Sequence, residues 1–385
     1  MTRQPSPKVA ILSAVHLALD NRVFYREART LARNGYDVTL IAVHHRDEQL
    51  DGVQIRALPR LPRARRPLLW RQLLRMARET EADVFHCHDP ELLLVSPWLR
   101  RLSGKPTIYD IHEANADFIA VKDYLPKGLR RPLAQTMRYL EPQLASRENG
   151  LIFADDAIAG SFASFHGPRI TLFNFPGQDL IDQGADPGPV YAEREPVVLY
   201  LGGLEPNRGS GIMLDVMERV VGQLPEARLL IVGHFQPPEL EMEMRREAER
   251  RGISHSLQIT GRVPFERIGD YLHQARIGWV TWQAYPKNEK NIPTKLFEYM
   301  AFGLPIVSSD LASIRPFVEP DNNGLLVVPN DSERHAEAII RLLRDDEAAL
   351  RLGLAGQQLV RTTYNWPAME PRLLAFYKAV LSRSA

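Results

Sequence analysis

A glycine-rich stretch in the second half of the chain has the composition of a phosphate-binding loop. It reads LGGLEPNRGSG and joins an apolar run, Val197–Leu201, to an amphipathic run that begins near Ile212. Gly203 and Gly209 allow tight backbone turns that expose N–H groups at a helix start, where a phosphate binds favourably. Arg208 adds a planar guanidinium that can grip two phosphate oxygens. A flexible turn with a surface arginine is the alternative, because the loop is neither G-x-G-x-x-G nor a P-loop.

A second stretch that can carry chemistry is NIPTKLFEYMAFGLPIVSSD, residues 291–310. Its pattern predicts a helix over Thr294–Phe302 that enters through a proline and runs into a buried strand. At this entrance we expect the amides of Thr294, Lys295 and Leu296 to be unpaired, with Lys295 adding a cation. Glu298 is long enough to accept hydrogen bonds from two ribose hydroxyls, and an ordinary surface ion pair is the alternative. We expect the core-facing side to hold Leu296, Phe297, Met300 and Ala301, and the opposite side Lys295, Glu298, Tyr299 and Phe302.

A third strand end in this half carries Arg262 and Val263. They follow Gly261 and the apolar run Leu257–Thr260, at a place where a planar base can lie against backbone groups. Taken alone, they are better explained by a simple strand-to-helix turn. Only together with the two stretches above do Arg262 and Val263 indicate a ligand-binding site.

Three groups of polar residues in the first half also follow predicted strands. They are His16, Asp20, Asn21 and Arg22, then His86–Asp89 (HCHD), then Asp110, His112 and Glu113. His112 and Glu113 have side chains that can contact sugar hydroxyls or move a proton. His86 and His88 point to the same side of a strand, which raises the question of a metal site. The sequence has no H-E-x-x-H, no CxxC and no second histidine cluster, so hydrogen-bonded core histidines are favoured and we expect no metal.

A basic stretch, residues 56–78, holds eight arginines and no acid. In its helical part, one face carries Arg71, Arg75 and Arg78, and another carries Leu69, Leu73 and Met76. One interpretation is a helix that lies on an anionic membrane through Arg66, Trp70, Arg71 and Arg75. The other is a helix packed on its own domain with a solvated basic face.

The elements that must position these residues alternate between strands and helices. In the first half the expected strands are Val9–Ser13, Val38–Val43, Val84–Cys87, Thr107–Tyr109, Leu151–Phe153 and Ile170–Phe173. In the second half they are Val197–Leu201, Arg228–Val232, Leu257–Thr260, Ile277–Trp282, Pro305–Ser308 and Leu325–Val328. Amphipathic runs between them predict helices, as in 22–34 and 129–147. This alternation predicts an α/β protein with parallel sheets covered by helices on both faces.

A stretch rich in proline, glycine and aspartate, residues 175–196, interrupts the alternation and is interpreted as a linker. We therefore expect two doubly wound domains, residues 1–185 and 186–366, followed by a final helix over 367–385. Ligands are expected at the carboxyl ends of the strands and in a deep cleft between the two domains.

Composition limits the classes of function. The chain has 385 residues, 44% hydrophobic and 25% charged, which is typical of a soluble protein of more than one domain. The net charge of +1 gives no overall attraction to nucleic acid, and no apolar run reaches the length of a bilayer span. The single cysteine, Cys87, fits a reducing compartment. We expect a cytoplasmic protein without a nucleic-acid partner.

The motifs together resemble a known family. The run from Ile259 to Pro329, with TKLFEYMAFGLPIVSSD at its centre, is similar to the donor-binding half of retaining GT-B glycosyltransferases of family 4. In the first half, LALDNRVFYREARTLARNGYDVTLIA, ADVFHCHDPELLL and KPTIYDIHE resemble a bacterial branch that builds surface polysaccharides. The likeness covers nearly the whole chain. It implies a GT-B fold whose last helix crosses back to the first domain.

The resemblance also implies roles for individual residues. Glu298 matches the glutamate that holds the ribose hydroxyls, and Arg208 matches a basic residue that binds the diphosphate. His112 matches a histidine close to the donor sugar and its phosphate. The loop around Asp20, Asn21 and Arg22 is expected to face the donor diphosphate and the acceptor. The expected catalytic residues are His112, Glu113 and Asp20, and the expected donor-binding residues are Gly203, Arg208, Gly209, Arg262, Val263, Thr294, Lys295, Leu296 and Glu298.

Two positions depart from the family pattern. Leu204 stands where the phosphate loop usually begins with an arginine, and Lys290 stands where an E-x7-E pair has its first glutamate. Glu289, one residue away, is a candidate replacement. Because the missing glutamate normally reads sugar hydroxyls, the sequence leaves the donor sugar open.

The implied function is transfer of a hexose-type sugar from a nucleotide-diphosphate donor, UDP first and GDP second, to a glycan or lipid-linked acceptor in surface polysaccharide synthesis. No D-x-D motif is present, so we expect no metal at the diphosphate and no cofactor. The lipid-linked acceptors of the family favour a peripheral contact with the inner face of the cytoplasmic membrane. Two alternatives stay open, a UDP-sugar 2-epimerase on the same fold and a non-catalytic homologue that acts as a partner subunit.

Overall fold

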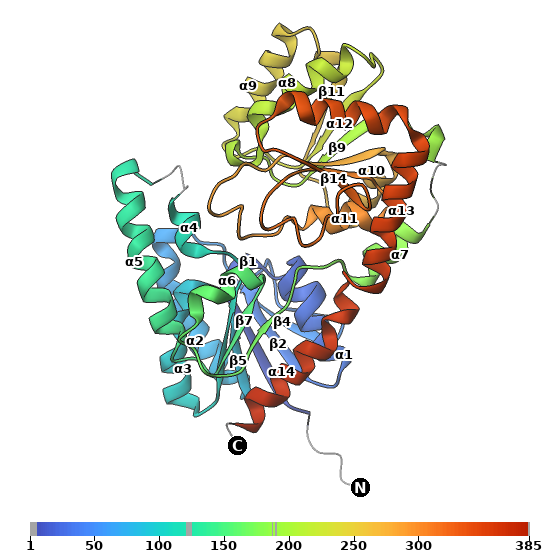
Figure 1. Ribbon diagram of the computed structural model, residues 1–385. Helices are drawn as coiled ribbons and strands as arrows, with labels where there is room; N and C mark the ends of the chain where they lie inside the picture. Colours follow the sequence, from blue (N-terminus) through green and yellow to red (C-terminus); the bar gives the residue numbers. More distant parts are fainter. Residues whose placement is uncertain (1–5, 121–124, 187, 189–190, 384–385) are drawn as a thin grey trace. The chain divides into compact units, whose positions relative to one another are not determined.

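The computed structural model describes residues 6–120, 125–186, 188 and 191–383. These residues form two compact units, the first comprising the described residues up to Asn174 and from Trp366 onward, and the second those of 175–365. Each unit has its own sheet, covered by helices (Figure 1). The predicted α/β class with two doubly wound domains is confirmed.

Eight strands form the sheet of the first unit, in the order β3-β4-β2-β1-β5-β6-β7-β8. They are β1 (Lys8–Leu17), β2 (Asp37–Val43), β3 (Glu48–Leu50), β4 (Val53–Leu58), β5 (Val84–Cys87), β6 (Thr107–Ile111), β7 (Gly150–Phe153) and β8 (Arg169–Thr171). All neighbours are parallel except β3, which pairs antiparallel with β4. Because β1 lies between β2 and β5, the strand order reverses there, at the position where doubly wound sheets bind ligands.

Helices on both faces bury the apolar strands of this unit. They are η1 (Asn21–Ala28), α1 (Arg29–Arg33), η2 (Arg63–Leu69), α2 (Trp70–Glu79), η3 (Pro90–Leu94), α3 (Ser96–Ser103), α4 (Asn115–Ala120), α5 (Lys127–Ala145), α6 (Asp156–Ala159), η4 (Gly160–Phe162), η9 (Trp366–Ala368) and α14 (Glu370–Ser382). The helix expected over 22–34 begins as η1, which is wound as a π-helix, a rare form that is frequent at functional sites. Helix α14 packs so closely on β7 that a Cβ on Gly150 would lie 2.6 Å from the Phe376 ring.

Six parallel strands form the sheet of the second unit, in the order β11-β10-β9-β12-β13-β14. They are β9 (Val197–Leu201), β10 (Arg228–Val232), β11 (Leu257–Gly261), β12 (Ile277–Val280), β13 (Ile306–Ser309) and β14 (Gly324–Val327). The helices are α7 (Gln178–Ala185), η5 (Tyr191–Glu193), η6 (Pro206–Arg208), α8 (Ser210–Val221), α9 (Glu239–Arg250), η7 (Ser254–Ser256), η8 (Phe265–Arg267), α10 (Ile268–Gln274), α11 (Lys295–Ala301), α12 (Ser332–Arg344) and α13 (Asp346–Thr362). Here β9 occupies the switch position, between β10 and β12.

Two features of the fold differ from expectation. The β3–β4 hairpin was not predicted, although its turn, Asp51-Gly52, has positive φ angles of 50° and 82° and is a strong hairpin signal. The domain boundary lies at 174/175 rather than at 185/186, because the expected linker contains α7, which packs on α11. A Cβ on Gly184 would lie 2.1 Å from the carbonyl oxygen of Ala301.

Candidate active site

The glycine-rich loop after β9 is held in a tight conformation by the residues that follow β12. Gly202 and Gly209 have φ angles of +102° and +89°, which residues with a side chain rarely adopt. A Cβ on Gly209 would lie 2.0 Å from the carbonyl oxygen of Thr281. The Thr281 hydroxyl in turn donates to the carbonyl oxygen of Arg208 at 2.5 Å. The loop is therefore a closely packed turn that needs glycine at position 209.

Arg208 is held in place by contacts within this loop, but its guanidinium remains accessible to a ligand. Its Nη1 donates to the Gly203 carbonyl oxygen at 2.9 Å, and its Nη2 lies 3.3 Å from Oε1 of Glu205. The guanidinium carbon lies 5.5 Å from the centroid of the Trp282 ring. The side chain stays 23% exposed, so an anion can still reach the guanidinium. A planar cation held in this way is pre-organised for two phosphate oxygens.

Lys295 has the most unusual environment in the second unit. The residue is 5% exposed, and its Nζ lies 3.4 Å above the centroid of the Tyr200 ring. This ammonium has no hydrogen-bond partner among the residues that the structure describes. Burial, together with the positive charge of Arg208, lowers the pKa of Lys295 well below its ordinary value, and Glu298 only partly offsets this. A buried cation that has no hydrogen-bond partner in the described part of the chain and lies beside a second cation is a position that an anionic ligand would stabilise.

The helix that carries Lys295 is attached to the end of β9 by Tyr299. The Tyr299 hydroxyl accepts from the Leu201 amide at 2.8 Å and donates to the Leu199 carbonyl at 3.1 Å. Tyr299 and Phe302 were expected on the outer face, but both are buried, because helix α11 contacts protein on more than one side.

The amide of Leu296 was expected to be free for a ligand, and this prediction was wrong. It donates to the Pro293 carbonyl oxygen at 3.1 Å, and the Leu296 side chain is buried in the core. Thr294 is exposed and Glu298 is half-buried, so both side chains can be reached from solvent.

The loop after β10 brings a histidine to the same edge of the sheet. The His234 carbonyl accepts from the Leu204 amide at 2.9 Å, and a Cβ on Gly203 would lie 3.0 Å from the His234 ring. Burial and the charges of Arg262 and Arg208 lower the pKa of His234. Arg262 is exposed and Val263 is half-buried beyond β11. His234 was not predicted from the sequence, although the residue directly follows strand β10 and a glycine.

The two departures from the family pattern have different structural settings. Leu204 is fully buried in the core of the second unit, so an apolar residue is required there. Lys290 is half-buried, and the neighbouring Glu289 accepts through Oε2 from the Ala312 amide at 2.8 Å.

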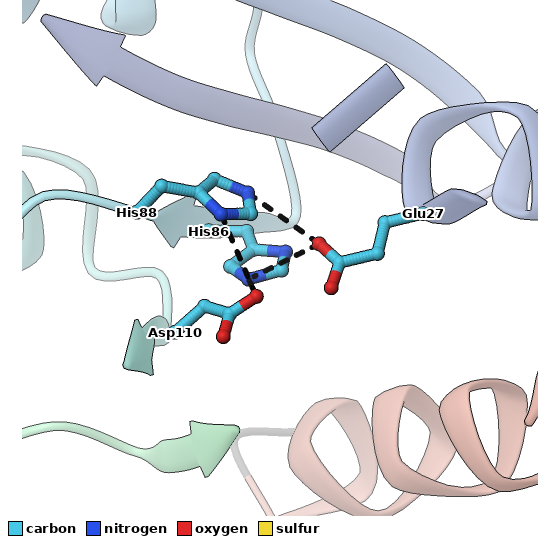
Figure 2. A group of neighbouring side chains, drawn as sticks. All are labelled: Glu27, His86, His88 and Asp110. Carbon is cyan, nitrogen blue, oxygen red and sulfur yellow. Dashed lines mark ion pairs between the residues drawn. The ribbon is translucent and has the colours of Figure 1, made fainter. Parts of the chain in front are cut away.

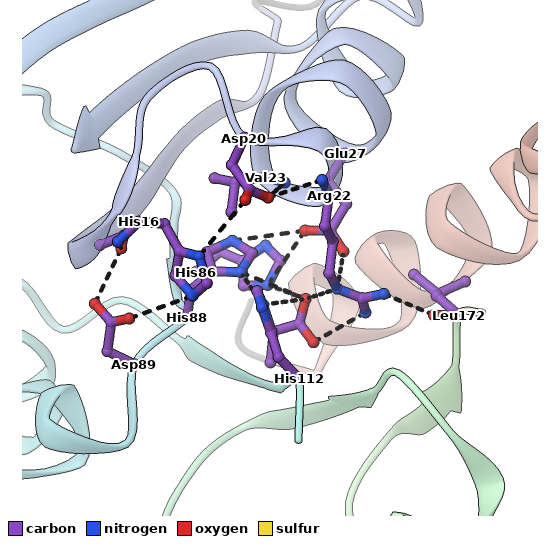
Figure 3. A network of polar contacts seen from close by, with 12 residues as sticks. His16, Asp20, Arg22, Val23, Glu27, His86, His88, Asp89, His112 and Leu172 are labelled. Carbon is purple, nitrogen blue, oxygen red and sulfur yellow. Dashed lines mark hydrogen bonds and ion pairs between the residues drawn. The ribbon is translucent and has the colours of Figure 1, made fainter. Parts of the chain in front are cut away.

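In the first unit, Asp20 caps helix η1 and Arg22 is a structural residue. Oδ1 of Asp20 accepts from the amides of Arg22 and Val23 at 2.8 and 3.1 Å. Arg22 is 3% exposed, and its Nε and Nη2 donate to Asp110 at 2.8 and 2.9 Å. Its Nη1 donates to the Leu172 carbonyl at 2.7 Å (Figure 3). The expectation that Arg22 faces a diphosphate is therefore wrong, because all three guanidinium nitrogens are engaged inside the unit. Asn21, beside it, is half-buried.

His16 and His112 lie together at the carboxyl edge of this sheet. Their ring centroids are 4.7 Å apart, and His16 lies 3.7 Å from Oδ2 of Asp20 and 3.6 Å from Oδ1 of Asp89. Burial opposes a charge on His16, but the two carboxylates outweigh it and raise the pKa of His16. His112 is 16% exposed, and its Nε2 lies 2.8 Å from Nδ1 of His88. His16 thus lies between Asp20 and His112, two of the residues expected to be catalytic. Glu113, the third, follows His112 in the chain and is half-buried.

Beneath His112 lies a group of buried polar residues that the sequence analysis interpreted only in part. Glu27, His86, His88 and Asp110 each offer one ligand atom, and these atoms all lie within 4.8 Å of one another (Figure 2). The sequence pointed to His86, His88 and Asp110 but not to Glu27, whose helical position looks like ordinary amphipathic sequence.

The basic helix α2 packs on its own unit. Two of the four residues predicted to contact a membrane, Arg66 and Trp70, face that unit. Arg66 is buried, with Nη1 3.3 Å from Oε2 of Glu91, and Trp70 packs against the core. Arg66 is therefore unavailable for a membrane contact, whereas Trp70 is only partly covered by its own unit. Arg71 and Arg75 are exposed. Among the described residues, no helix is both long and apolar enough to cross a bilayer.

Family models match both units of the chain. Residues 21–173 match the model described as Glycosyltransferase Family 4, and residues 195–345 match the model described as Glycosyl transferases group 1. The chain belongs to glycosyltransferase family 4.

Curated relatives of this glycosyltransferase include lipid-modifying enzymes. It is 24% identical over 319 residues to the phosphatidyl-myo-inositol mannosyltransferase of Mycobacterium leprae. The aligned region covers 82% of this chain and 78% of the relative. It is 25% identical over 293 residues to the D-inositol 3-phosphate glycosyltransferase of Segniliparus rotundus, covering 73% and 63% of the two chains.

Solved structures confirm the GT-B fold of the glycosyltransferase. Sucrose-phosphate synthase from Thermosynechococcus elongatus superposes with a TM-score of 0.75 at 19% identity, covering 98% of this chain and 100% of the other. Anabaena HepE in complex with UDP-glucose gives 0.74 at 15% identity, covering 96% and 99%. At these identities the likeness concerns the fold.

Proposed function

We propose that this glycosyltransferase is a retaining enzyme that moves a hexose from a nucleoside diphosphate to a glycan or lipid-linked acceptor in cell-surface polysaccharide synthesis. The observation that carries the proposal is the buried ammonium of Lys295, which has no hydrogen-bond partner in the described part of the chain and lies beside Arg208. Two cations at a glycine-rich strand end fit a diphosphate, because the negative charges of the two phosphates would balance the positive charges of Arg208 and Lys295.

The remaining donor contacts follow from this position of the diphosphate. Glu298, three residues after Lys295 on α11, is proposed to accept the ribose hydroxyls. Arg262 and Val263 are proposed to lie against the base, with exposed Thr294 at the helix start. UDP is our first choice of nucleotide and GDP the second. One curated relative is named as GDP-mannose-dependent and one structural neighbour was solved with UDP-glucose, so both deserve testing.

The proposed reaction is a same-face displacement without a metal at the diphosphate. The bond between the anomeric carbon and the β-phosphate oxygen breaks, and the acceptor oxygen bonds to that carbon on the same face. The acceptor proton passes to the departing β-phosphate. Arg208 and Lys295 stabilise the growing negative charge on the diphosphate, which is the usual role of fixed cations in such a site. His112, with Glu113 and Asp20, is proposed to act on the sugar or the acceptor.

The acceptor side is proposed to include a peripheral membrane contact, revised from the sequence prediction. A hollow between α2 and α3 is lined by Arg71, Leu74, Arg75, Arg78, Glu79 and Leu102. Three exposed arginines around apolar side chains complement an anionic lipid surface. Replacing Arg71, Arg75 and Arg78 together by glutamine is expected to weaken binding to phosphatidylglycerol vesicles by at least about 100-fold. The matched control replaces Arg245, Arg246 and Arg250 on α9, and equal flotation of both variants would contradict the contact.

A calorimetric screen of UDP-, GDP-, ADP- and dTDP-sugars tests the donor site. We expect micromolar to millimolar binding of one sugar nucleotide, loss of binding in Arg208→Ala, and release of the nucleoside diphosphate when acceptor is added. Interconversion of the sugar without release would instead support the 2-epimerase alternative. Binding without any turnover would support the non-catalytic alternative, and full turnover by Arg208→Ala would contradict the mechanism.

A further inference from the structure

We propose that the first unit binds one divalent metal ion of the zinc class through Glu27, His86, His88 and Asp110. The four residues come from helix η1, strand β5 with the residue just after it, and strand β6 (Figure 2). Nδ1 of His88 lies 2.8 Å from Nε2 of His112. Their exposed fractions are 0%, 0%, 2% and 0%. The proposal concerns the architecture of the first unit and does not depend on the donor site of the second unit.

The first observation is a set of buried ligand atoms that the protein leaves unsatisfied. Oε2 of Glu27, Nε2 of His86 and Nε2 of His88 have no hydrogen-bond partner within the described ranges of the chain. A buried polar atom without a partner costs about 1–3 kcal/mol, so three of them side by side need an explanation. All three are aimed at one another in Figure 2.

The second observation is the spacing of these atoms. Oε2 of Glu27 lies 3.5 Å from Nε2 of His88 and 3.9 Å from Nε2 of His86, and Oδ2 of Asp110 lies 3.8 Å from Nε2 of His86. These distances are too long for direct hydrogen bonds. Tetrahedral zinc bound to nitrogen and oxygen at about 2.0–2.2 Å separates its ligands by about 3.4 Å. Side-chain movements that bring all four atoms, now within 4.8 Å of one another, to this separation would close a four-ligand shell.

The third observation is that the other ring nitrogens are already occupied. Nδ1 of His86 lies 2.8 Å from the Tyr377 hydroxyl, and Nδ1 of His88 lies 2.8 Å from Nε2 of His112. Metal-binding histidines in proteins almost always have this second-nitrogen partner, which orients the ring and fixes the tautomer. Here it turns Nε2 of both rings toward Glu27. The contact of His88 with His112 would also let the metal fix the ring of His112.

The competing occupant of this position is a proton. Arg22 supplies one positive charge, through its bonds to Asp110 and its Nε 3.1 Å from Oε1 of Glu27, against two carboxylates. One negative charge then remains, which either a proton on Glu27 or a metal ion would offset. A proton on Glu27 satisfies one oxygen, whereas a metal satisfies the three unpartnered ligand atoms at once, and this difference favours the metal.

Metal analysis of the full-length chain tests the proposal. The protein is purified, stripped with a chelator, reloaded with zinc and desalted, and its zinc is then measured by mass spectrometry. We expect one zinc per chain and a thermal midpoint that rises on loading. Glu27→Gln, which keeps the side-chain shape, is expected to weaken zinc binding at least about 100-fold while circular dichroism stays that of the wild type.

A matched control is His44→Gln, which removes a histidine near a glutamate at the edge of the unit, since Nε2 of His44 lies 2.7 Å from Oε1 of Glu48. This variant is expected to keep the wild-type zinc content. As a second readout, cobalt loading is expected to give the intense visible absorption of a tetrahedral site. The proposal is overturned if the wild type holds no more zinc than Glu27→Gln, or if His44→Gln loses the metal equally. Either result would assign the missing charge to a proton.

Discussion

Replacing Lys295 by methionine is expected to change folding stability and ligand affinity in opposite directions. Methionine keeps the length of the side chain and removes the charge. The ammonium is buried without a hydrogen-bond partner among the described residues, which costs several kcal/mol of desolvation. Its position over the Tyr200 ring offsets about 2 kcal/mol of this cost as a cation–π contact. We therefore expect the free energy of unfolding of the ligand-free variant to increase by about 1–3 kcal/mol.

Affinity for the nucleoside diphosphate is expected to fall in the same variant. A charge-assisted hydrogen bond from a buried ammonium to phosphate contributes about 1.5–3 kcal/mol, which corresponds to a dissociation constant about 10- to 150-fold higher. Affinity for the nucleoside alone is expected to stay constant, because Lys295 is assigned to the phosphates.

Urea unfolding and isothermal titration with UDP, GDP and the nucleosides measure both effects. Lys378→Met, at an exposed position of α14, is the control for replacement of a lysine by methionine. The reasoning is refuted if Lys295→Met unfolds at lower urea and binds the diphosphate as the wild type does. Lys295 would then be a structural cation stabilised by the Tyr200 ring.

Three further outcomes test the second unit. Glu298→Ala is expected to weaken UDP or GDP binding about 10-fold or more and to leave inorganic pyrophosphate binding unchanged, and equal losses for both ligands in calorimetry would contradict its ribose role. Gly209→Ala is expected to destabilise the unit by more than about 2 kcal/mol in urea, because φ is +89° and Thr281 blocks a side chain; an unchanged midpoint would disprove the close packing. Burial lowers the pKa of His335 from 6.5 to about 4. As pH falls from about 6.5 to 4, the histidine therefore takes up a proton in the unfolded chain but not in the folded one. The free energy of unfolding is expected to fall over this range by up to about 3 kcal/mol. His335→Gln, which can still accept from Trp279, is expected to remove that part of the pH dependence of the urea midpoint, and a persistent dependence would place its origin elsewhere.

Sequence patterns predicted the parallel sheets well because each buried strand is a continuous apolar run. Strands β5, β9 and β10 have the expected bounds, since a parallel strand covered on both faces tolerates few polar residues. The β3–β4 hairpin was not predicted, because its strands are short and partly exposed and their apolar pattern is weak.

Side-chain environments were harder to predict than elements. A pattern places Lys295 near a strand end, but it does not show that Tyr200 lies under the ammonium, because the two residues come from different elements. Arg22 gave the opposite error. The sequence places it after the first strand, but it does not show that Asp110 and Leu172, which are distant in sequence, engage its guanidinium.

Helix α14 completes a unit whose other residues end at Asn174, and this has a consequence for synthesis on the ribosome. Tyr377 meets His86 across 291 residues, and Trp366 meets Thr30 across 336. When the first half of the chain emerges, the surface around Gly150 that receives Phe376 is still uncovered. The second unit is continuous in sequence and can close as soon as it is made. The half that is translated first is thus the half that matures last, and the surface that receives α14 stays exposed in the interval.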